Sequence, residues 1–299
     1  MQNVMTDLPL APLLGLQGLS VEVLDVGAAP AEAGRYAALA AQGLARITAV
    51  EPAAENTAPL LARGVDRVLP VFLGDGRPAR LYTTRDPRFS SLFEPDPAVI
   101  DRFTALAAGP GGNLQIVYTT DVQTARLDDV LPDRRPDYLR VDIQGGELAA
   151  LEHGAAALAT AAVVEVETAF VALYKGQPLL GDVQGLMRRH GFVLHKLIDV
   201  AGRAFLPLSA PNRHEPISQL LWCDAVFVRD FGALAGHSDD QLLKGALILN
   251  DLYHSFDLAL LLLAEHDRRR GTGYAATYHQ ALQSAPALHP QFLTIKTQP

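Results

Sequence analysis

The chain has 299 residues, of which 49% are hydrophobic, and a formal net charge of −8 at pH 7. This length supplies a large hydrophobic core, and the negative charge disfavours nonspecific binding to nucleic acids or anionic membranes. The single cysteine, Cys223, cannot form an intrachain disulfide, and its apolar neighbours predict a buried side chain. No basic patch precedes an apolar run at the amino terminus, and the apolar segment 258–264 is far shorter than the roughly 20 residues of a membrane-spanning helix. We therefore expect a cytoplasmic protein without a signal peptide or a membrane span.

The first informative segment is a predicted strand, Val21–Val26, followed by a loop of small residues and a predicted helix from Glu32 to Leu44. A strand, loop and helix in this order are typical of the start of a nucleotide-binding unit. Such a loop lets backbone N–H groups and the amino end of the helix approach a polar or anionic ligand. Asp25 and Gly27 stand where the strand meets this loop.

The next predicted strand, 47–51, ends in Glu51, roughly two dozen residues beyond Gly27. An acid at this spacing commonly accepts hydrogen bonds from ribose hydroxyls. The pattern predicts a nucleotide cofactor without identifying it. An NAD-dependent oxidoreductase is therefore one alternative, because Glu51 would hold the ribose of NAD equally well.

A third segment joins an apolar strand, 138–142, to an amphipathic helix that begins at Glu147, through Gly145 and Gly146. Asp142 ends the strand. In open α/β sheets, ligands bind outside the carboxyl ends of the strands, so Asp142 is well placed to contact one. The alternative is an ordinary turn in which the acid and the glycines serve the backbone alone.

The alternation of predicted strands and helices favours an α/β doubly wound sandwich with a mostly parallel sheet. The connection 84–101 either carries substrate contacts or is a solvated loop with Phe89 and Phe93 in the core. Ser90 and Ser91 lack the setting of a nucleophile elbow, so we expect a hydrogen bond or a turn there. Further strands are predicted at 67–73, 114–119, 163–167, 192–197 and 220–228, with short edge or hairpin strands at 80–83 and 203–206.

Acidic side chains supply the candidate general bases. Glu165 and Glu167 alternate with valines and so share one face of their strand, and Glu167 lies at its end. Burial there would raise the pKa of Glu167 and suit it to accept a proton. Asp142 is the other leading candidate, and His195 is a third. Nine histidines are present, but none pairs with an acid at metal-binding helical spacing, so we predict no metal site.

The carboxyl-terminal part of the chain is predicted to be helical. Ser238 to Gln241 has the form of a capping box, and 268–270 is an arginine run followed by Gly271, which suits a helix end rather than a phosphate site. A single helix over this span would be roughly 48 Å long, so a break near Asn250 is expected. Its many leucines must pack somewhere. We expect a Rossmann-like domain over 1–230 and a helical appendage over 231–299, which either folds back on that domain or forms a homodimer interface.

A series of motifs follows in order along the chain: 25–28, 50–52, 90–92, 126–129, 139–147 and 164–167, continued by 173–179 and 190–192. This series resembles the FkbM family of S-adenosylmethionine-dependent methyltransferases. The resemblance runs from about residue 19 to residue 228 and implies a Rossmann-like class I methyltransferase sandwich. It also implies an O-methyltransferase that acts on a hydroxyl of a sugar, glycan or natural product.

The resemblance also implies where S-adenosylmethionine binds. Asp25, Gly27, Ala29 and Glu51 would form the cofactor cradle, Asp75 would face the adenine, and Asp142 would lie near the transferable methyl group. Two departures stand out: the cradle loop 29–34 is longer than in the family, and Gln144 and Gly146 replace a frequent Glu and Ala. A cofactor-binding or assembly protein without turnover is therefore a second alternative.

Overall fold

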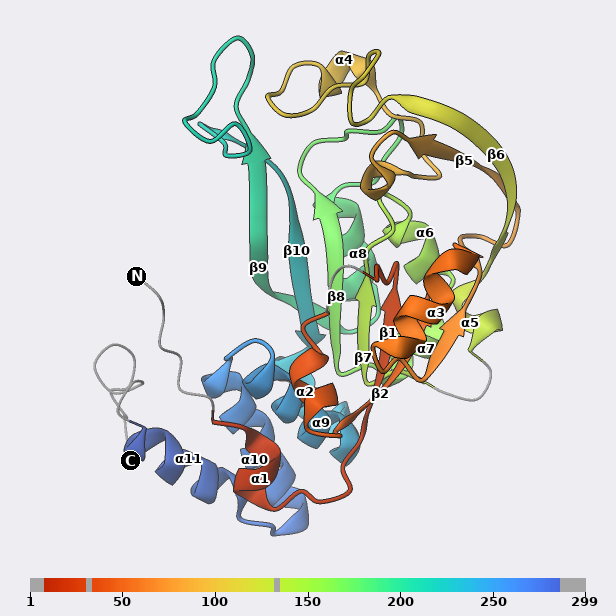
Figure 1. Ribbon diagram of the computed structural model, residues 1–299. Coiled ribbons are helices and arrows are strands. Elements are labelled where there is room, and N and C mark those ends of the chain that lie inside the picture. Colours follow the sequence, from red (N-terminus) through yellow and green to blue (C-terminus); the bar gives the residue numbers. More distant parts are fainter. Residues whose placement is uncertain (1–7, 31–33, 132–134, 286–299) are drawn as a thin grey trace. The chain divides into compact units, whose positions relative to one another are not determined.

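The structure is a computed structural model that describes residues 8–30, 34–131 and 135–285 (Figure 1). The chain forms two compact units. One comprises 22–34 and 46–231, and the other comprises 1–21, 35–45 and 232–299. We describe each unit by itself. The predicted division into 1–230 and 231–299 stays a prediction.

A seven-stranded sheet forms the centre of the first unit within the described residues, in the order β3-β2-β1-β7-β8-β10-β9. β2 with β3, β1 with β7, and β7 with β8 pair in parallel, whereas β10 is antiparallel to both of its neighbours. This sheet confirms the predicted mostly parallel α/β architecture. Its strands are β1 (Val21–Val26), β2 (Ala45–Val50), β3 (Arg67–Leu69), β7 (Tyr138–Val141), β8 (Val163–Ala169), β9 (Phe192–Arg203) and β10 (Gln219–Arg229).

The strand order reverses between β1 and β7, which are neighbours although they are far apart in sequence. Val26 lies opposite Val141, and the N–H of Asp142 donates to the carbonyl of Val26 at 2.9 Å. In doubly wound sheets a ligand binds at such a switch point. The end of β7 and the loop after β1 therefore mark the expected site.

One face of the sheet is the main hydrophobic core. Residues such as Leu24, Leu139, Val164 and Phe227 alternate along their strands and pack against apolar residues of the helices. The opposite face carries charged side chains at the intervening positions. The helices of this core are α5 (Leu127–Val130), α6 (Glu147–Glu152), α7 (Ala155–Thr160) and α8 (Leu180–Arg189), and α3 (Ala54–Ala62) contacts β3.

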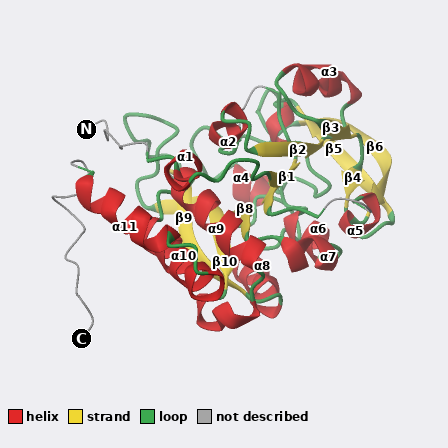
Figure 2. Ribbon diagram, turned by 90° about the horizontal axis from the view of Figure 1, so that it is seen from below, coloured by secondary structure: helices red, strands yellow, loops and turns green. Residues whose placement is uncertain are grey.

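A second, three-stranded sheet has the order β4-β6-β5, with β4 at Phe72–Leu73, β5 at Pro78–Thr84 and β6 at Ile116–Ala125 (Figure 2, yellow). The single strand predicted over 67–73 is thus wrong, because β3 and β4 join different sheets. β6 is longer than the predicted 114–119 and pairs antiparallel with β5. The short strand predicted at 203–206 is also absent as such, since Arg203 ends β9 and Phe205 makes an isolated bridge to Phe103.

The connection 84–101 contains a 3-10 turn at Pro87–Phe89 and the short helix α4 at Pro97–Ile100. Phe89 and Phe93 pack against a small apolar cluster that includes Ile100, Phe103 and Tyr174. These two rings therefore belong to a core, as the second interpretation of this segment expected.

Helices make up most of the second unit: α1 (Leu10–Leu14), α2 (Ala37–Ala41), α9 (Asp239–Asp251), α10 (Phe256–Arg270) and α11 (Tyr274–Ser284). A 3-10 segment at Phe231–Gly236 precedes α9. The helix predicted from Glu32 to Leu44 is shorter, since α2 ends before Gly43, which lies at φ +70°. Residues 32 and 33 of that prediction lie outside the described part of the chain. α11 lies within the span 231–299 that was predicted to be helical, but its bounds were not predicted.

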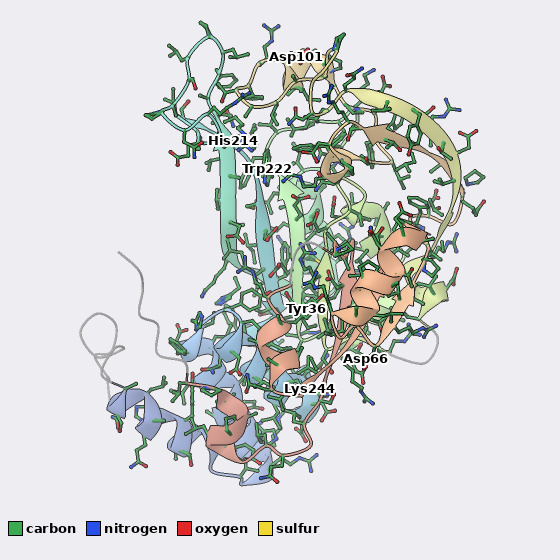
Figure 3. All side chains as sticks on the ribbon, in the orientation of Figure 1. Tyr36, Asp66, Asp101, His214, Trp222 and Lys244 are labelled. Carbon is green, nitrogen blue, oxygen red and sulfur yellow. The ribbon has the colours of Figure 1, made fainter. Side chains whose placement is uncertain are left out.

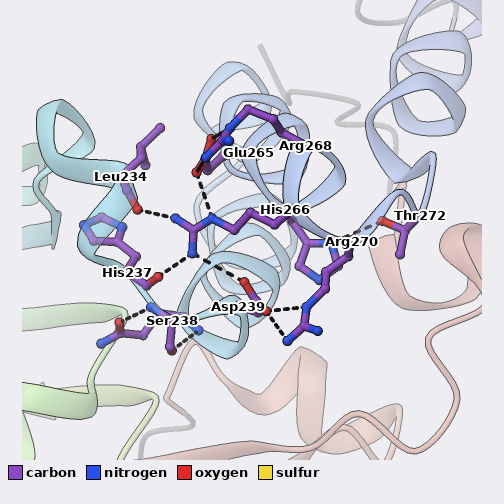
Figure 4. Close-up of polar contacts among 11 residues, drawn as sticks. Leu234, His237, Ser238, Asp239, Glu265, His266, Arg268, Arg270 and Thr272 are labelled. Carbon is purple, nitrogen blue, oxygen red and sulfur yellow. Dashed lines mark hydrogen bonds and ion pairs between the residues drawn. The ribbon is translucent and has the colours of Figure 1, made fainter.

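The predicted helix from Ser238 does break after Asp251, and its capping box is confirmed (Figure 4). The hydroxyl of Ser238 accepts from the N–H of Gln241 at 3.1 Å, and the side chain of Gln241 accepts from the N–H of Ser238 at 3.0 Å. The arginines at the end of α10 pair with Glu265 and Asp239, as expected for a helix end. No helix in the described residues is long and apolar enough to cross a membrane.

Candidate functional site

Gly27 brings the loop after β1 directly against the end of β7. A Cβ built on Gly27 would lie 1.8 Å from the carbonyl oxygen of Asp142, and the residue has φ +86°. Both facts require glycine, because an L side chain would clash and would be strained in this conformation. The structure therefore brings two predicted site residues, Gly27 and Asp142, into backbone contact.

Glu51 follows β2 and is half-buried. Its Oε1 accepts from the N–H of Ala53 at 2.9 Å and from the amide of Asn56 at 3.1 Å. Both of these bonds use Oε1, so Oε2 can still accept from a ribose hydroxyl. Burial raises the pKa of Glu51, although these two hydrogen bonds oppose the rise.

The other predicted cradle residues have quite different surroundings. The carbonyls of Ala29 and Pro30 both accept from the guanidinium of Arg63, which fastens the first part of the unusual loop. Asp75 lies after β4, where its carboxylate accepts from the N–H of Arg77 at 2.9 Å. Its side chain is 45% exposed and lies 3.7 Å from the guanidinium of Arg77. The roles of Ala29 and Asp75 stay predictions.

Arg140 joins acids from three neighbouring strands on the charged face of the sheet. Its guanidinium donates to Asp25 at 3.0 Å and to Asp142 at 2.7 Å, and it lies 3.6 Å from Glu165. Asp25 and Glu165 are almost completely buried. Burial alone would lower the pKa of Arg140, but the three carboxylates raise it, so the guanidinium stays charged. Asp25 is thereby held in a buried ion pair, and Asp142 has a fixed cationic partner.

Gln144 joins Asp142 to the second predicted base, Glu167. Its amide Nε2 lies 2.6 Å from Glu167 Oε2 and 3.1 Å from Asp142 Oδ1. Burial raises the pKa of Glu167 well above its ordinary value, and the charges of Asp142 and Glu147 raise it further. Asp224 of β10 lies opposite Glu167, and burial raises the pKa of Asp224 to about 7. The two predicted bases therefore share one site.

The turn that carries these groups is held by hydrogen bonds from both of its sides. Glu147 is buried and accepts from the N–H groups of Ile143 and Gly145 at 2.9 and 3.0 Å. Burial raises the pKa of Glu147 to about 7, although these N–H groups oppose the rise. The hydroxyl of Ser91 donates to the carbonyl of Gln144 at 2.5 Å, which confirms the hydrogen-bonding role expected for this serine pair.

Trp222 lies two residues before Asp224 on β10 and so shares its face of the strand (Figure 3). The guanidinium of Arg203 lies 4.9 Å from its ring centroid.

His195, the third predicted base, lies on β9 at the edge of the sheet, with β10 between it and β8. Cys223 is completely buried, as predicted. No group of acids, histidines or cysteines among the described residues is arranged to hold a metal ion.

The sequence pattern missed Arg140 and Tyr174. Arg140 was detectable, because it interrupts an apolar strand and lies two residues from Asp142, on the same face. Tyr174 reaches the site from the loop after β8, and the motif 173–179 contains it without indicating its contacts. The resulting site is a cluster of carboxyl groups with raised proton affinity beside one fixed cation. Such a cluster can orient a hydroxyl group and accept its proton.

A family model described as the methyltransferase FkbM domain matches residues 25–194. No curated protein matches the chain in sequence.

Among solved structures, 46 chains match. One is the magnesium protoporphyrin IX methyltransferase ChlM from Synechocystis PCC 6803 with bound SAM, which is 12% identical with a TM-score of 0.35 over 74% of this chain and 76% of that one. Another is Sp1610 of Streptococcus pneumoniae, a putative tRNA (m1A22) methyltransferase, which is 12% identical with a TM-score of 0.34 over 95% and 100% of the two chains. The precorrin-6y C5,15-methyltransferase of Geobacter metallireducens GS-15 is 14% identical, with a TM-score of 0.34 over 73% and 87%.

Proposed function

The chain belongs to the family of FkbM methyltransferases, which use S-adenosylmethionine, and from that premise we propose that it methylates a hydroxyl group of a sugar, glycan or natural product. The observation that carries this proposal is the pair of acids, Asp142 and Glu167, joined by one amide beside the loop after β1. The cofactor supplies an electrophilic methyl group on a sulfonium. The residues of this chain must bind the cofactor, position the acceptor hydroxyl and accept its proton.

The cofactor cradle in this proposal consists of Asp25, Gly27, Ala29 and Glu51, with Asp75 at the adenine. Two observations support the fit. The missing Cβ of Gly27 lets the loop lie against the end of β7, at the switch point of the sheet. Oε2 of Glu51 is oriented by the two hydrogen bonds on its partner oxygen and can accept from ribose hydroxyls.

Methyl transfer needs the acceptor oxygen, the methyl carbon and the sulfur nearly in line, so positioning supplies much of the rate. A neutral hydroxyl is a poor nucleophile and loses its proton as the new O–C bond forms. Glu167 and Asp142 are the candidates to receive that proton. Burial raises the pKa of Glu167 and so increases its affinity for a proton, whereas Asp142 accepts a hydrogen bond from Arg140.

The charge of the site restricts the acceptor. Among the described residues, the carboxyl groups of Asp142, Glu147, Glu167 and Asp224 lie around it, and the guanidinium of Arg140 already donates to Asp25 and Asp142. A phosphate or carboxylate next to the reacting hydroxyl would therefore find no unengaged cation among these residues. We therefore expect a neutral or cationic group around the methylated oxygen.

Calorimetry and methyl transfer test the proposal together. S-adenosylhomocysteine should bind and NAD should not. Labelled methyl groups should then pass from S-adenosylmethionine to a hydroxyl in a panel of glycans and natural products. Binding of NAD instead would favour the oxidoreductase, and binding of S-adenosylhomocysteine without turnover would favour the cofactor-binding or assembly protein.

The location, domain division and oligomeric state of the protein are part of the same proposal. We keep a cytoplasmic location, the division into 1–230 and 231–299, and a homodimer through the carboxyl-terminal helices as expectations. Leu261 on α10 is 43% exposed and is the large apolar side chain that such an interface would cover. Light scattering of the purified protein tests the dimer.

A further inference from the structure

Gln144 lies at the centre of the acidic site, and its side chain touches three other side chains. Its Nε2 is 2.6 Å from Glu167 Oε2 and 3.1 Å from Asp142 Oδ1, and its Oε1 is 3.4 Å from the hydroxyl of Tyr174. We propose that Gln144 is a positioning residue that fixes the carboxylate of Glu167 for proton transfer, and that Tyr174 fixes the orientation of the Gln144 amide. The inference rests on the proposed function for the identity of the reacting hydroxyl.

The orientation of the amide follows from the chemistry of its neighbours. The NH₂ group of Gln144 faces Glu167 and Asp142, whose carboxyl oxygens accept from it. The carbonyl oxygen of Gln144 then faces Tyr174, whose single hydroxyl hydrogen is shared between the carbonyl of Phe89 at 3.0 Å and Gln144 Oε1 at 3.4 Å. Tyr174 is almost completely buried, and burial raises its pKa, so it remains a hydroxyl. Its contact stabilises one of the two possible amide orientations.

The backbone of Gln144 is held just as firmly. The residue has φ +54°, a conformation that L residues other than Asn and Asp rarely adopt. Ser91 donates to its carbonyl, and Glu147 accepts from the N–H groups of the residues on both of its sides. These bonds maintain a strained conformation whose visible result is an amide placed between two acids.

A neutral partner has a different effect on an acid than a charged one. The guanidinium of Arg140 donates to Asp142, whereas the amide of Gln144 donates to Glu167 without adding positive charge. Glu167 thus keeps a defined position and still has a raised affinity for a proton. In the transfer, the hydroxyl proton passes to a Glu167 oxygen as the O–C bond forms, and the S–C bond breaks to leave a neutral thioether.

The Gln144→Met variant tests this role. Methionine has about the length of glutamine and is equally strained at the positive φ of this position, but its side chain donates no hydrogen bond. The Glu167 carboxyl is titrated by ¹³C NMR in glutamate-labelled full-length protein, with Glu167→Gln identifying its signal. Loss of the N–H donor destabilises the carboxylate, so the midpoint should rise by about one pH unit, the size of a hydrogen bond to a charged group. The matched control is Gln115→Met, whose side chain accepts from the N–H of Gly111 and should leave the midpoint unchanged.

Tyr174→Phe provides the second variant. It keeps the amide but removes the contact that orients it, so we expect a smaller rise in the same direction. An unchanged midpoint in Gln144→Met, or an equal rise in Gln115→Met, would overturn the proposal. If Gln144→Met does not fold, Tyr174→Phe decides: a rise supports the proposal and an unchanged midpoint contradicts it. The titration needs neither cofactor nor acceptor, so a failure of the proposed function would appear separately, as a lack of S-adenosylhomocysteine binding.

Discussion

The carbonyl oxygen of Asp142 lies 1.8 Å from the point where a Cβ of Gly27 would stand. Backbone therefore packs directly on backbone where the loop after β1 meets the end of β7. One residue of this contact belongs to the proposed cofactor cradle, and the other carries a candidate base. A shift at Gly27 should therefore displace the backbone of Asp142 as well.

Replacing Gly27 by Ala should destabilise the protein more than the same change at a glycine without neighbours. Gly64 is the matched control, with φ +90° and no atom within 4 Å of a Cβ. Gly64→Ala should cost about 1–2 kcal/mol for the left-handed backbone alone. Gly27→Ala adds a clash with a backbone carbonyl and should cost about 1–3 kcal/mol more. Urea unfolding measures the loss of unfolding free energy in both variants. Equal losses would show that the backbone around Asp142 moves aside at little cost.

Glu51→Ala should weaken S-adenosylhomocysteine binding by about 1.5–3 kcal/mol, the range of hydrogen bonds to charged groups. Glu55→Ala is the control, because Glu55 is an exposed acid in the neighbouring helix α3. Calorimetry of both folded variants separates a direct contact from a general change in charge. Unchanged affinity in Glu51→Ala would refute the ribose assignment.

Local patterns were enough to predict the strands that define the site. β1, β7 and β8 are short runs rich in β-branched and other apolar residues, and the capping box at Ser238 is read from four consecutive residues. The second sheet was not predictable in this way. Its pairing of β5 with β6 joins residues about forty apart, and no local pattern distinguishes it from an extra strand of the main sheet.

The candidate acids were also predictable, but their partners were not. Strand periodicity places Glu167 on a face and at a strand end, without indicating what lies beside it. The contacts of Arg140 require three strands in register, and those of Gln144 require a positive φ and a tyrosine from another loop. These are properties of the tertiary structure, which the order of residues along one segment does not encode.

Glu167→Gln and Asp142→Asn should each keep the fold and lose about 10²-fold or more in methyl transfer, the lower end of acid–base contributions. Their pH profiles should differ. If Glu167 accepts the proton, the rate falls as the pH drops through its pKa, and Glu167→Gln removes that limb whereas Asp142→Asn retains it. Near-normal turnover in Asp142→Asn would leave Glu167 as the base. Loss of the fold would instead show that the bond from Arg140 to Asp142 is structural.

Glu147 should make the protein less stable as the pH rises towards neutrality. Burial raises its pKa from the ordinary 4.5 to about 7, so the folded state binds its proton more tightly than the unfolded state does. The unfolding free energy that protonation contributes is complete below pH 4.5 and is lost as the pH rises through 7. Glu147→Gln cannot titrate and should show a flatter profile. Urea unfolding between these pH values tests this, and identical profiles would contradict it.

Removing everything after Arg229 should strongly destabilise what remains. Within the helical unit, α1 contacts both α9 and α11, and the N–H of Leu10 donates to the carboxylate of Asp251 at 3.1 Å. Leu10 and Leu39 are completely buried. Truncation takes away α9, α10 and α11, which belong to the same compact unit as these two leucines. Uncovering several hundred Å² of apolar surface costs several kcal/mol at roughly 25 cal/mol per Å², a large share of a domain's stability.

The truncated protein should therefore aggregate or melt well below the full chain in a thermal scan. Leu10→Ala in the full-length protein is the matched partial change, and it should cost about 2–5 kcal/mol because it leaves a cavity beneath the helices. A truncated chain that is soluble, equally stable and changes from dimer to monomer in light scattering would identify the helices as a subunit interface. If it is equally stable and the oligomeric state does not change, the packing of α1 against α9 and α11 contributes little, and the structural role assigned to these helices is wrong.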